Sequence, residues 1–214
     1  TTMGTLKHGN QISPIWSALD SVDPFASGMG GNATNMFNDG GKRMSNTINY
    51  SHSLGPVAGQ VAYGFGEVPG SVNDGRTIGA AVKGTFGPVY TTVAYHSTDT
   101  GSDQARTFLV GGTVDVTSGL KAHGAVADNK GLNNHDTRDY MLGVSAKATD
   151  VDTFLGSVIR KQDRSVANND ATQYAVGWTH HLSPRTNLYT SYAHINYDAQ
   201  PKDRLVMVGI RHKF

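Results

Sequence analysis

Tight turns recur about every thirty residues along this chain of 214 residues, and this rhythm constrains its fold more than any other feature. The turns are Gly55-Pro56, Gly87-Pro88, Ser118-Gly119, Thr149-Asp150 and Ser183-Pro184. One longer polar loop lies between consecutive tight turns, so each repeat holds one hairpin. Each half-repeat has about ten residues of alternating apolar and polar character, the length and period of a tilted strand that crosses a bilayer. Tight turns at one end and long loops at the other are typical of a transmembrane β-barrel.

Alternation of apolar and polar side chains holds in most of the expected strands. Successive side chains of a strand point to opposite faces, so a wall that meets lipid must be apolar on one face. In the closing strand, one face carries Val206, Val208, Ile210, His212 and Phe214, and the other carries Met207, Gly209, Arg211 and Lys213. Similar apolar faces contain Val57, Ile78, Phe108, Tyr140 and Tyr174. The segments 152–162 and 186–197 are apolar on both faces, so we assign them as strands and leave their facing open.

Residues 1–214 are therefore expected to form one all-β domain, a transmembrane antiparallel β-barrel with about twelve strands. The expected strands lie near residues 2–11, 43–54, 57–67, 76–86, 89–97, 105–117, 120–129, 138–149, 152–162, 171–182, 186–197 and 204–214. The loops 68–75, 98–104, 130–137, 163–170 and 198–203 are rich in Asn, Asp, Gly and Ser. We expect these loops to face solvent.

The composition supports a barrel and argues against a helical membrane protein. Only 37% of the residues are hydrophobic, mean hydropathy is -0.37, and there is no apolar run long enough for a transmembrane helix. A barrel with a polar lumen needs apolar side chains only at alternate positions. The 26 glycines and 9 tyrosines suit curved strands with aromatic girdles. The chain starts without Met or a signal-peptide pattern, so we expect a processed chain or a fragment.

Several function classes find no support in the sequence. The net charge of +1 and the lack of a basic block argue against a nucleic-acid partner. The chain has no cysteine, which excludes disulfides and thiol chemistry. His180 and His181 are adjacent, so their side chains point to opposite faces and cannot chelate one ion. There is no nucleophile elbow or closely spaced carboxylate pair, so we expect no catalytic residue, no metal and no cofactor.

One connection differs from all the others. From Ile12 to Lys42 the chain runs about thirty residues without a transmembrane pattern, and a loop that long in a compact domain is usually functional. It contains a helix-like stretch over 15–19, an acidic segment, and a glycine-rich turn over 28–31. Trp16 and Phe25 need an apolar surface. We therefore expect the loop to fold inward and to narrow the lumen.

Three segments carry a resemblance to a known family. They are residues 4–11 (GTLKHGNQ) followed by the long loop, residues 42–50 (KRMSNTINY), and the closing residues 208–214 (VGIRHKF). They resemble the fifth strand with the constriction loop, the sixth strand and the last strand of the general trimeric porins of Gram-negative bacteria, most closely those of beta-proteobacteria. Such porins have about sixteen strands, so this chain would supply the last twelve. Asn10 stands where the family usually has an arginine, so one basic group is absent.

The resemblance implies an outer-membrane channel for passive diffusion of small hydrophilic solutes and ions. It further implies a homotrimer among outer-membrane lipid and lipopolysaccharide, and a role for the terminal Phe214 as an assembly signal. Its constriction would set Asp20 and Asp23 of the loop against Arg43 of the wall, and opposite charges across a narrow lumen create a field that sorts solutes. Arg43 shares parity with Thr47, which predicts that it points into the lumen. The alternatives are that the two acids cap a helix or turn, and that Arg43 is an interfacial strand-end charge.

The charges assigned to the lumen predict a weak preference for anions. Basic residues at inward positions outnumber acidic ones, which raises the local anion concentration where the lumen is narrow. The basic residues are Arg43, Lys83, Lys121, Lys147, Arg211 and Lys213, and the acidic residues are Asp115 and Asp139. The loop acids Asp20 and Asp23 offset part of this excess.

Two other function classes and one structural question stay open. An outer-membrane barrel enzyme would need an organised triad or carboxylate cluster, which the sequence does not display. A soluble β-sandwich binding protein would stay monodisperse without detergent, whereas a barrel would not. The twelve strands could close into a narrower barrel, or the first and last strands could be left as unpaired edges.

Overall fold

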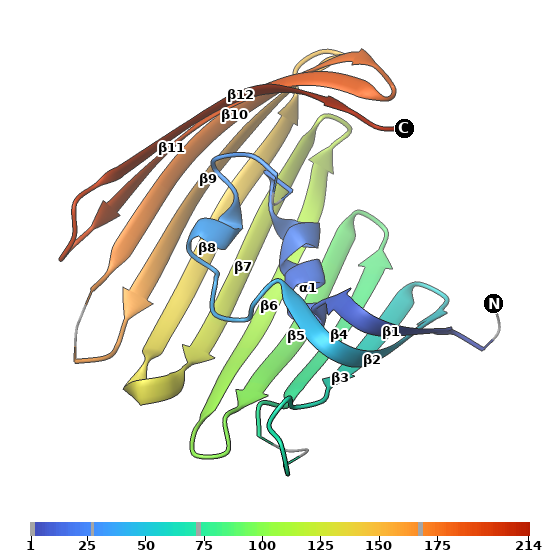
Figure 1. The fold of residues 1–214 in the computed structure, drawn as a ribbon. Coiled ribbons are helices and arrows are strands. Elements are labelled where there is room, and N and C mark those ends of the chain that lie inside the picture. The colour runs from blue at the N-terminus through green and yellow to red at the C-terminus, as the bar shows by residue number, and fades with distance from the viewer. Residues whose placement is uncertain (1–2, 27, 72–73, 167–168) are drawn as a thin grey trace.

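The computed structural model describes residues 3–26, 28–71, 74–166 and 169–214 and contains one curved antiparallel sheet. Its twelve strands pair in sequence order, each with its neighbours along the chain (Figure 1). The strands are β1 (Thr5–Ile12), β2 (Arg43–Leu54), β3 (Val57–Gly64), β4 (Thr77–Phe86), β5 (Val89–Asp99), β6 (Gln104–Thr117), β7 (Leu120–Lys130), β8 (Asp136–Lys147), β9 (Asp152–Asp163), β10 (Ala171–Ser183), β11 (Thr186–Tyr197) and β12 (Asp203–His212). The all-β prediction is confirmed, with strand bounds within a few residues of those expected.

The sheet curves into a trough, and within the described residues β1 and β12 do not pair with each other. The narrower closed barrel, one of the two alternatives, is therefore not adopted. Tight turns join the strands at one end of the trough and longer loops join them at the other (Figure 1). Gly55 and Gly87 occupy two of the tight turns with φ of 56° and 58°, in the left-handed region that glycine enters without steric cost.

The two faces of the sheet differ in the way that the alternation predicts. On β8, Tyr140, Leu142 and Val144 are exposed on the outer face, whereas Asp139 and Met141 are buried on the inner face. The same division holds on β6 and β10. The outer face is apolar and open, as a wall facing lipid requires.

The structure also settles the facing of the two segments that the sequence left open. Val158 of β9 points outward and is exposed, while Ser157 and Ile159 point inward and are buried. On β11, Ala193 and Ile195 face inward. These strands are apolar on both faces because their inner side packs against the long loop rather than against water.

The long connection between β1 and β2 lies inside the trough (Figure 1). It holds α1 (Pro14–Val22), the 3-10 helix η1 (Ala33–Asn35) and extended segments, and a second 3-10 helix, η2 (Leu132–Asn134), lies in the β7–β8 loop. The sequence predicts a helix over 15–19, and α1 is longer because Ser13 caps it and Pro14 opens it. Among the described residues, no helix has the length and apolarity needed to cross a membrane.

One face of α1 is buried against the inner wall of the sheet. Ile15, Ala18, Leu19 and Val22 belong to a core that includes wall residues such as Leu109. Spacings of three and four residues place these side chains on a single stripe of the helix. The inward fold of the loop is thus confirmed, and its effect on conductance stays a prediction.

Candidate pore constriction

The middle of the long loop is fixed to β10 and β11 by polar side chains that point into the trough. Gln173 Nε2 donates to the Gly31 carbonyl at 3.0 Å, and Asn35 Nδ2 donates to Gln173 Oε1 at 2.8 Å. Ser191 Oγ accepts from the Gly30 N–H at 3.0 Å. Gln173 is fully buried, so its bonds to the loop satisfy polar atoms that water cannot reach. These contacts attach the middle of the loop to the inner wall of the sheet.

The last part of the loop is held by a lysine on β9. Lys161 Nζ lies 2.7 Å from Asp39 Oδ2 and donates to the Met36 carbonyl at 2.8 Å. His135 Nε2 contacts the other oxygen of Asp39 at 2.8 Å. Lys161 is largely buried, so this ion pair is screened less by solvent than a surface pair would be. We name these four residues and Asp139 the loop anchor.

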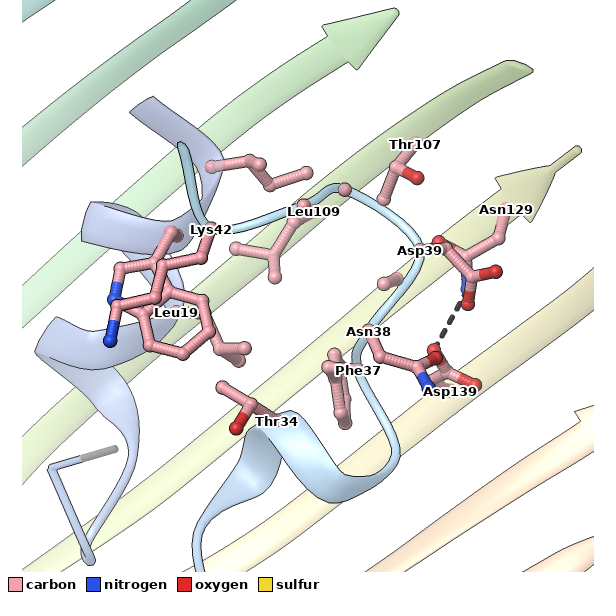
Figure 2. A pocket seen from close by; sticks show the side chains of 15 residues that line it. Leu19, Thr34, Phe37, Asn38, Asp39, Lys42, Thr107, Leu109, Asn129 and Asp139 are labelled. Atoms are coloured by element: carbon pink, nitrogen blue, oxygen red, sulfur yellow. Dashed lines mark hydrogen bonds between the residues drawn. The ribbon is translucent and has the colours of Figure 1, made fainter. Parts of the chain in front are cut away.

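A small cavity of about 160 Å³ separates the end of the loop from strands β6–β8 (Figure 2). Its walls are largely apolar, with Leu19, Phe37 and Leu109 among the lining side chains. Its polar end is formed by Asp139 and Asn129, and Asn129 Nδ2 donates to Asp139 Oδ2 at 2.8 Å (Figure 2). Asp139 Oδ1 is 3.9 Å from Lys161 Nζ, so the polar end of the cavity adjoins the lysine of the loop anchor.

Asp23, predicted as a constriction acid, is placed inside the loop instead. It is only 5% exposed, and its carboxylate accepts from the N–H groups of Phe25 at 3.0 Å and Ala33 at 2.9 Å. It thus caps the turn that follows α1 and joins two parts of the loop. The contacts support the alternative interpretation, a turn cap, and its carboxylate does not face an open lumen.

Asp20 has a different environment although it lies only three residues earlier. It is half-buried and shares the outer stripe of α1 with Trp16 and Ser17, at spacings of four and three residues. The opposite stripe of the helix packs on the wall. Asp20 is therefore the acid of α1 that faces away from the sheet, toward the interior of the trough.

Facing the first turn of α1, a polar cavity of about 510 Å³ lies against strands β1–β5. Lys7, Arg43 and Lys83 line it, and among its described lining residues there is no Asp or Glu. The rest of the lining includes amide and hydroxyl side chains as well as small apolar ones, and Gln60 Nε2 donates to Asn49 Oδ1 at 3.2 Å. We name Lys7, Arg43 and Lys83 the basic wall.

Arg43 lines this cavity, but its facing on β2 differs from the predicted one. The sequence places Arg43 on the same face as Thr47 by counting alternate residues. That count is wrong, because Asn46 has φ of 54° and the pairing shifts between Gly9 and Gln11. Met44 rather than Ser45 is therefore buried on the inner face with Thr47. Arg43 lines the cavity from the first position of β2, and its role in the constriction stays a prediction.

Lys7 also lines the polar cavity, although the sequence pattern did not predict its position. It stands opposite Asn49 in the pairing of β1 and β2, and Asn49 is buried on the inner face. Strand β1 is short and all its residues from Thr5 to His8 are exposed, so no apolar alternation marked its facing. The signal that would have found Lys7 is its register with the polar face of β2.

Several predicted lumen charges are already paired. Lys121 lies 3.3 Å from Asp115, and Lys147 lies 3.0 Å from Asp150 beside a tight turn. Arg211 lies over the Tyr189 ring, 5.4 Å from its centroid. Lys83 keeps the open position that the sequence predicts. Lys213 and Phe214 follow the end of β12, and the assembly role of Phe214 stays a prediction.

Comparisons with known proteins agree with the fold. The family model of the Gram-negative porins matches residues 1–200. The anion-selective porin from Comamonas acidovorans is 24% identical, with a TM-score of 0.81 over 100% of this chain and 75% of that chain. OmpT, an outer-membrane protein of Vibrio cholerae, is 14% identical, with a TM-score of 0.77 over 99% of this chain and 77% of that chain. OmpF of Salmonella typhi, in complex with daunomycin, is 14% identical with a TM-score of 0.71, over 100% and 75% of the two chains.

A comparison with curated proteins finds no match. The structural likenesses, all at low identity, establish the fold, and the family match covers nearly the whole chain. The chain therefore belongs to the Gram-negative porin family, and it is a channel protein of the outer membrane.

Proposed function

We propose that this porin is a passive diffusion channel with a preference for small anionic solutes, and that the basic wall opposite α1 sets that preference. The single observation that carries the proposal is the polar cavity of about 510 Å³, lined by Lys7, Arg43 and Lys83 without a carboxylate among its described lining residues. Cations that line a narrow aqueous passage raise the local concentration of anions. Passive diffusion requires no catalytic residue, metal or cofactor.

The acids that could cancel this field are mostly engaged elsewhere. Asp23 is buried and bound to backbone N–H groups, and Asp39 is bound to Lys161 and His135. Asp115 lies beside Lys121. Asp20 is the loop acid that still faces the interior, so it offsets one of the three cations. The likeness to an anion-selective porin from Comamonas acidovorans supports the same sign of selectivity.

The experiment is a reversal-potential measurement across a planar bilayer with a salt gradient, using the protein purified from outer membranes. The parent channel is expected to prefer anions, and the Lys83→Glu variant to lose or reverse that preference. Lys147→Gln is the matched control, because Lys147 is paired with Asp150 beside a turn. A parent channel that prefers cations, or a Lys83→Glu variant with unchanged selectivity, would contradict the proposal.

We further propose that the protein works as a homotrimer embedded among outer-membrane lipid and lipopolysaccharide. The exposed apolar outer face, with Leu142, Val176 and Val208 among its side chains, needs such surroundings. Mass measurement in detergent of the protein extracted without heating tests the assembly. A mass of one protomer under every mild extraction condition would contradict the trimer.

A further inference from the structure

One cavity has the size of a binding site for a single aromatic ring. It measures about 160 Å³, lies between the end of the long loop and strands β6–β8, and is named the loop cavity (Figure 2). An apolar cavity of about 150 Å³ in another protein takes up a benzene molecule. Leu19, Phe37 and Leu109 give the loop cavity similar walls, and Ala127 adds only a methyl group. A six-membered ring placed there would contact the loop and the wall of the sheet at once.

The polar end of the loop cavity carries a carboxylate oxygen that lacks a hydrogen bond. Asp139 is fully buried, and its Oδ2 accepts from Asn129 Nδ2 at 2.8 Å. Its Oδ1 is also buried and has no hydrogen-bond partner among the described residues. Lys161 Nζ is 3.9 Å from Oδ1, beyond hydrogen-bond distance. Because an unpaired buried oxygen is costly, Oδ1 marks the point where the polar group of a ligand would be favoured.

The charges around the loop cavity favour a neutral ligand. Lys161 stands beside the polar end, and Lys42 lies at the opposite end, with its Nζ 4.7 Å from the centroid of the Trp16 ring (Figure 2). A cationic ligand would meet these two ammonium groups, whereas an anionic ligand would meet Asp139. A hydroxyl group can donate to an ionised carboxylate or accept from a protonated one, so it suits Oδ1 in either state.

The loop cavity can be reached from water at the end formed by the loop. Asn38 and Lys42 line it and are exposed, and Trp16 lines it and is partly exposed. Leu109 and Asp139, which line it on the wall, are fully buried. A small molecule would therefore enter beside Lys42 with its polar group leading.

We propose that the loop cavity binds a neutral monocyclic phenol. The hydroxyl group lies at Asp139 Oδ1, and the ring lies between Phe37 of the loop and Leu109 of the wall. Because such a ligand contacts both, its binding stabilises the loop against the wall. The inference does not depend on the proposed anion preference, which rests on the basic wall at another cavity.

The test is a titration of the detergent-purified protein with 4-fluorophenol, followed through the fluorine NMR signal of the ligand. Saturable binding with a dissociation constant on the order of 1 mM is expected for a ligand of this size. Ala127→Leu fills the loop cavity and should weaken binding on the order of tenfold or more. Val126→Leu is the matched control, because Val126 is the next residue of β7 and is exposed on the outer face. Equal binding by the parent and Ala127→Leu would indicate uptake by micelles and overturn the proposal.

A ligand series on the parent protein gives a test that needs no variant to fold. Toluene lacks the hydroxyl group and should compete with 4-fluorophenol on the order of tenfold less well than phenol, because the hydrogen bond to Asp139 is lost. Benzylamine is protonated at neutral pH and should also compete less well, because Lys42 and Lys161 flank the site. Toluene that competes as well as phenol, or benzylamine that competes better, would overturn the proposal.

The position of the ligand between loop and wall provides a second readout. Saturating phenol should slow limited proteolysis of the long loop in the parent and in Val126→Leu, and should have no effect in Ala127→Leu. Equal rates of cleavage in the parent with and without phenol would place the ligand elsewhere and overturn the proposal. Absence of phenol binding from a channel that prefers anions would overturn this inference alone and leave the proposed function standing.

Discussion

The two walls that face the loop differ in their contacts with it. Strands β8–β11 bind it with buried charges and amides, namely Lys161, Asp139 and Gln173. Strands β1–β5 leave Lys7 and Lys83 at an aqueous cavity next to α1. The chain thus uses the same kinds of side chain for two purposes. Charges that are paired and buried position the loop, and we propose that the charges that stay open to water act on solutes.

The difference also explains why selectivity and stability should respond to separate sets of mutations. A buried pair stabilises by satisfying charges that have lost their water, and removal of one partner leaves the other uncompensated. An open cation makes no such contribution, and its loss changes the field in the lumen.

Removal of Lys161 should be the most damaging change on the anchoring wall. The Lys161→Ala variant leaves Asp39 and the fully buried Asp139 without their cation, at a cost of about 3 kcal/mol in the free energy of unfolding. Denaturant unfolding in detergent measures the loss, and single-channel recordings should show larger or noisier conductance as the loop moves. Lys147→Ala breaks the exposed pair with Asp150 and should change stability by less than about 0.5 kcal/mol. Equal losses in the two variants would remove the distinction between the walls.

Removal of the Asp23 carboxylate should come next. Asp23→Ala leaves the N–H groups of Phe25 and Ala33 without an acceptor, and charge-assisted bonds of this kind contribute about 2 kcal/mol. Limited proteolysis of the loop should become faster, together with a lower free energy of unfolding. Asp23→Asn keeps one oxygen acceptor and should lose less. If Asp23→Asn instead altered ion selectivity with full stability, the side chain would belong to the open lumen after all.

Loss of the α1 cap should have a smaller effect. Ser13 Oγ accepts from the Trp16 N–H at 3.2 Å and donates to the Gly41 carbonyl at 2.7 Å, so it closes the two ends of the loop. Ser13→Ala should cost about 1 kcal/mol of unfolding free energy, and Ser13→Thr should restore most of it. Denaturant unfolding of both variants provides the measurement. A Ser13→Thr variant as weak as Ser13→Ala would indicate a packing role for the small side chain.

The wall was predictable from the sequence because its signal is local and repeated. Strands such as β8 alternate strictly, since Tyr140 and Leu142 must meet lipid while Asp139 and Met141 do not. The alternation failed where another segment supplies the apolar surroundings, as on β9 and β11 behind the loop. It also failed at Arg43, where one bulge at Asn46 reverses the face of every residue before it.

The site was only partly predictable, because partners far apart in sequence determine whether each charged side chain is paired or open to water. Asp20 and Asp23 look equivalent in the sequence. In the structure, the Asp23 carboxylate accepts a hydrogen bond from the Ala33 N–H, whereas Asp20 is half-buried and faces the trough. The pairing of Lys161 with Asp39 joins residues more than a hundred positions apart. Neither contact leaves a periodic pattern that could be read from the chain.

The smallest expected effect is also the one that best separates Asp20 from Asp23. Asp20 lies on the open stripe of α1, so Asp20→Asn should leave the free energy of unfolding unchanged within about 0.5 kcal/mol. It removes the negative charge that offsets the basic wall, and the reversal potential should therefore move further toward anions. Asp20→Asn and Lys83→Gln should shift the reversal potential in opposite directions, because one removes an acid and the other a base from the same passage. A shift of the same sign in both variants would show that these side chains act on the position of the loop, rather than on the field across the lumen.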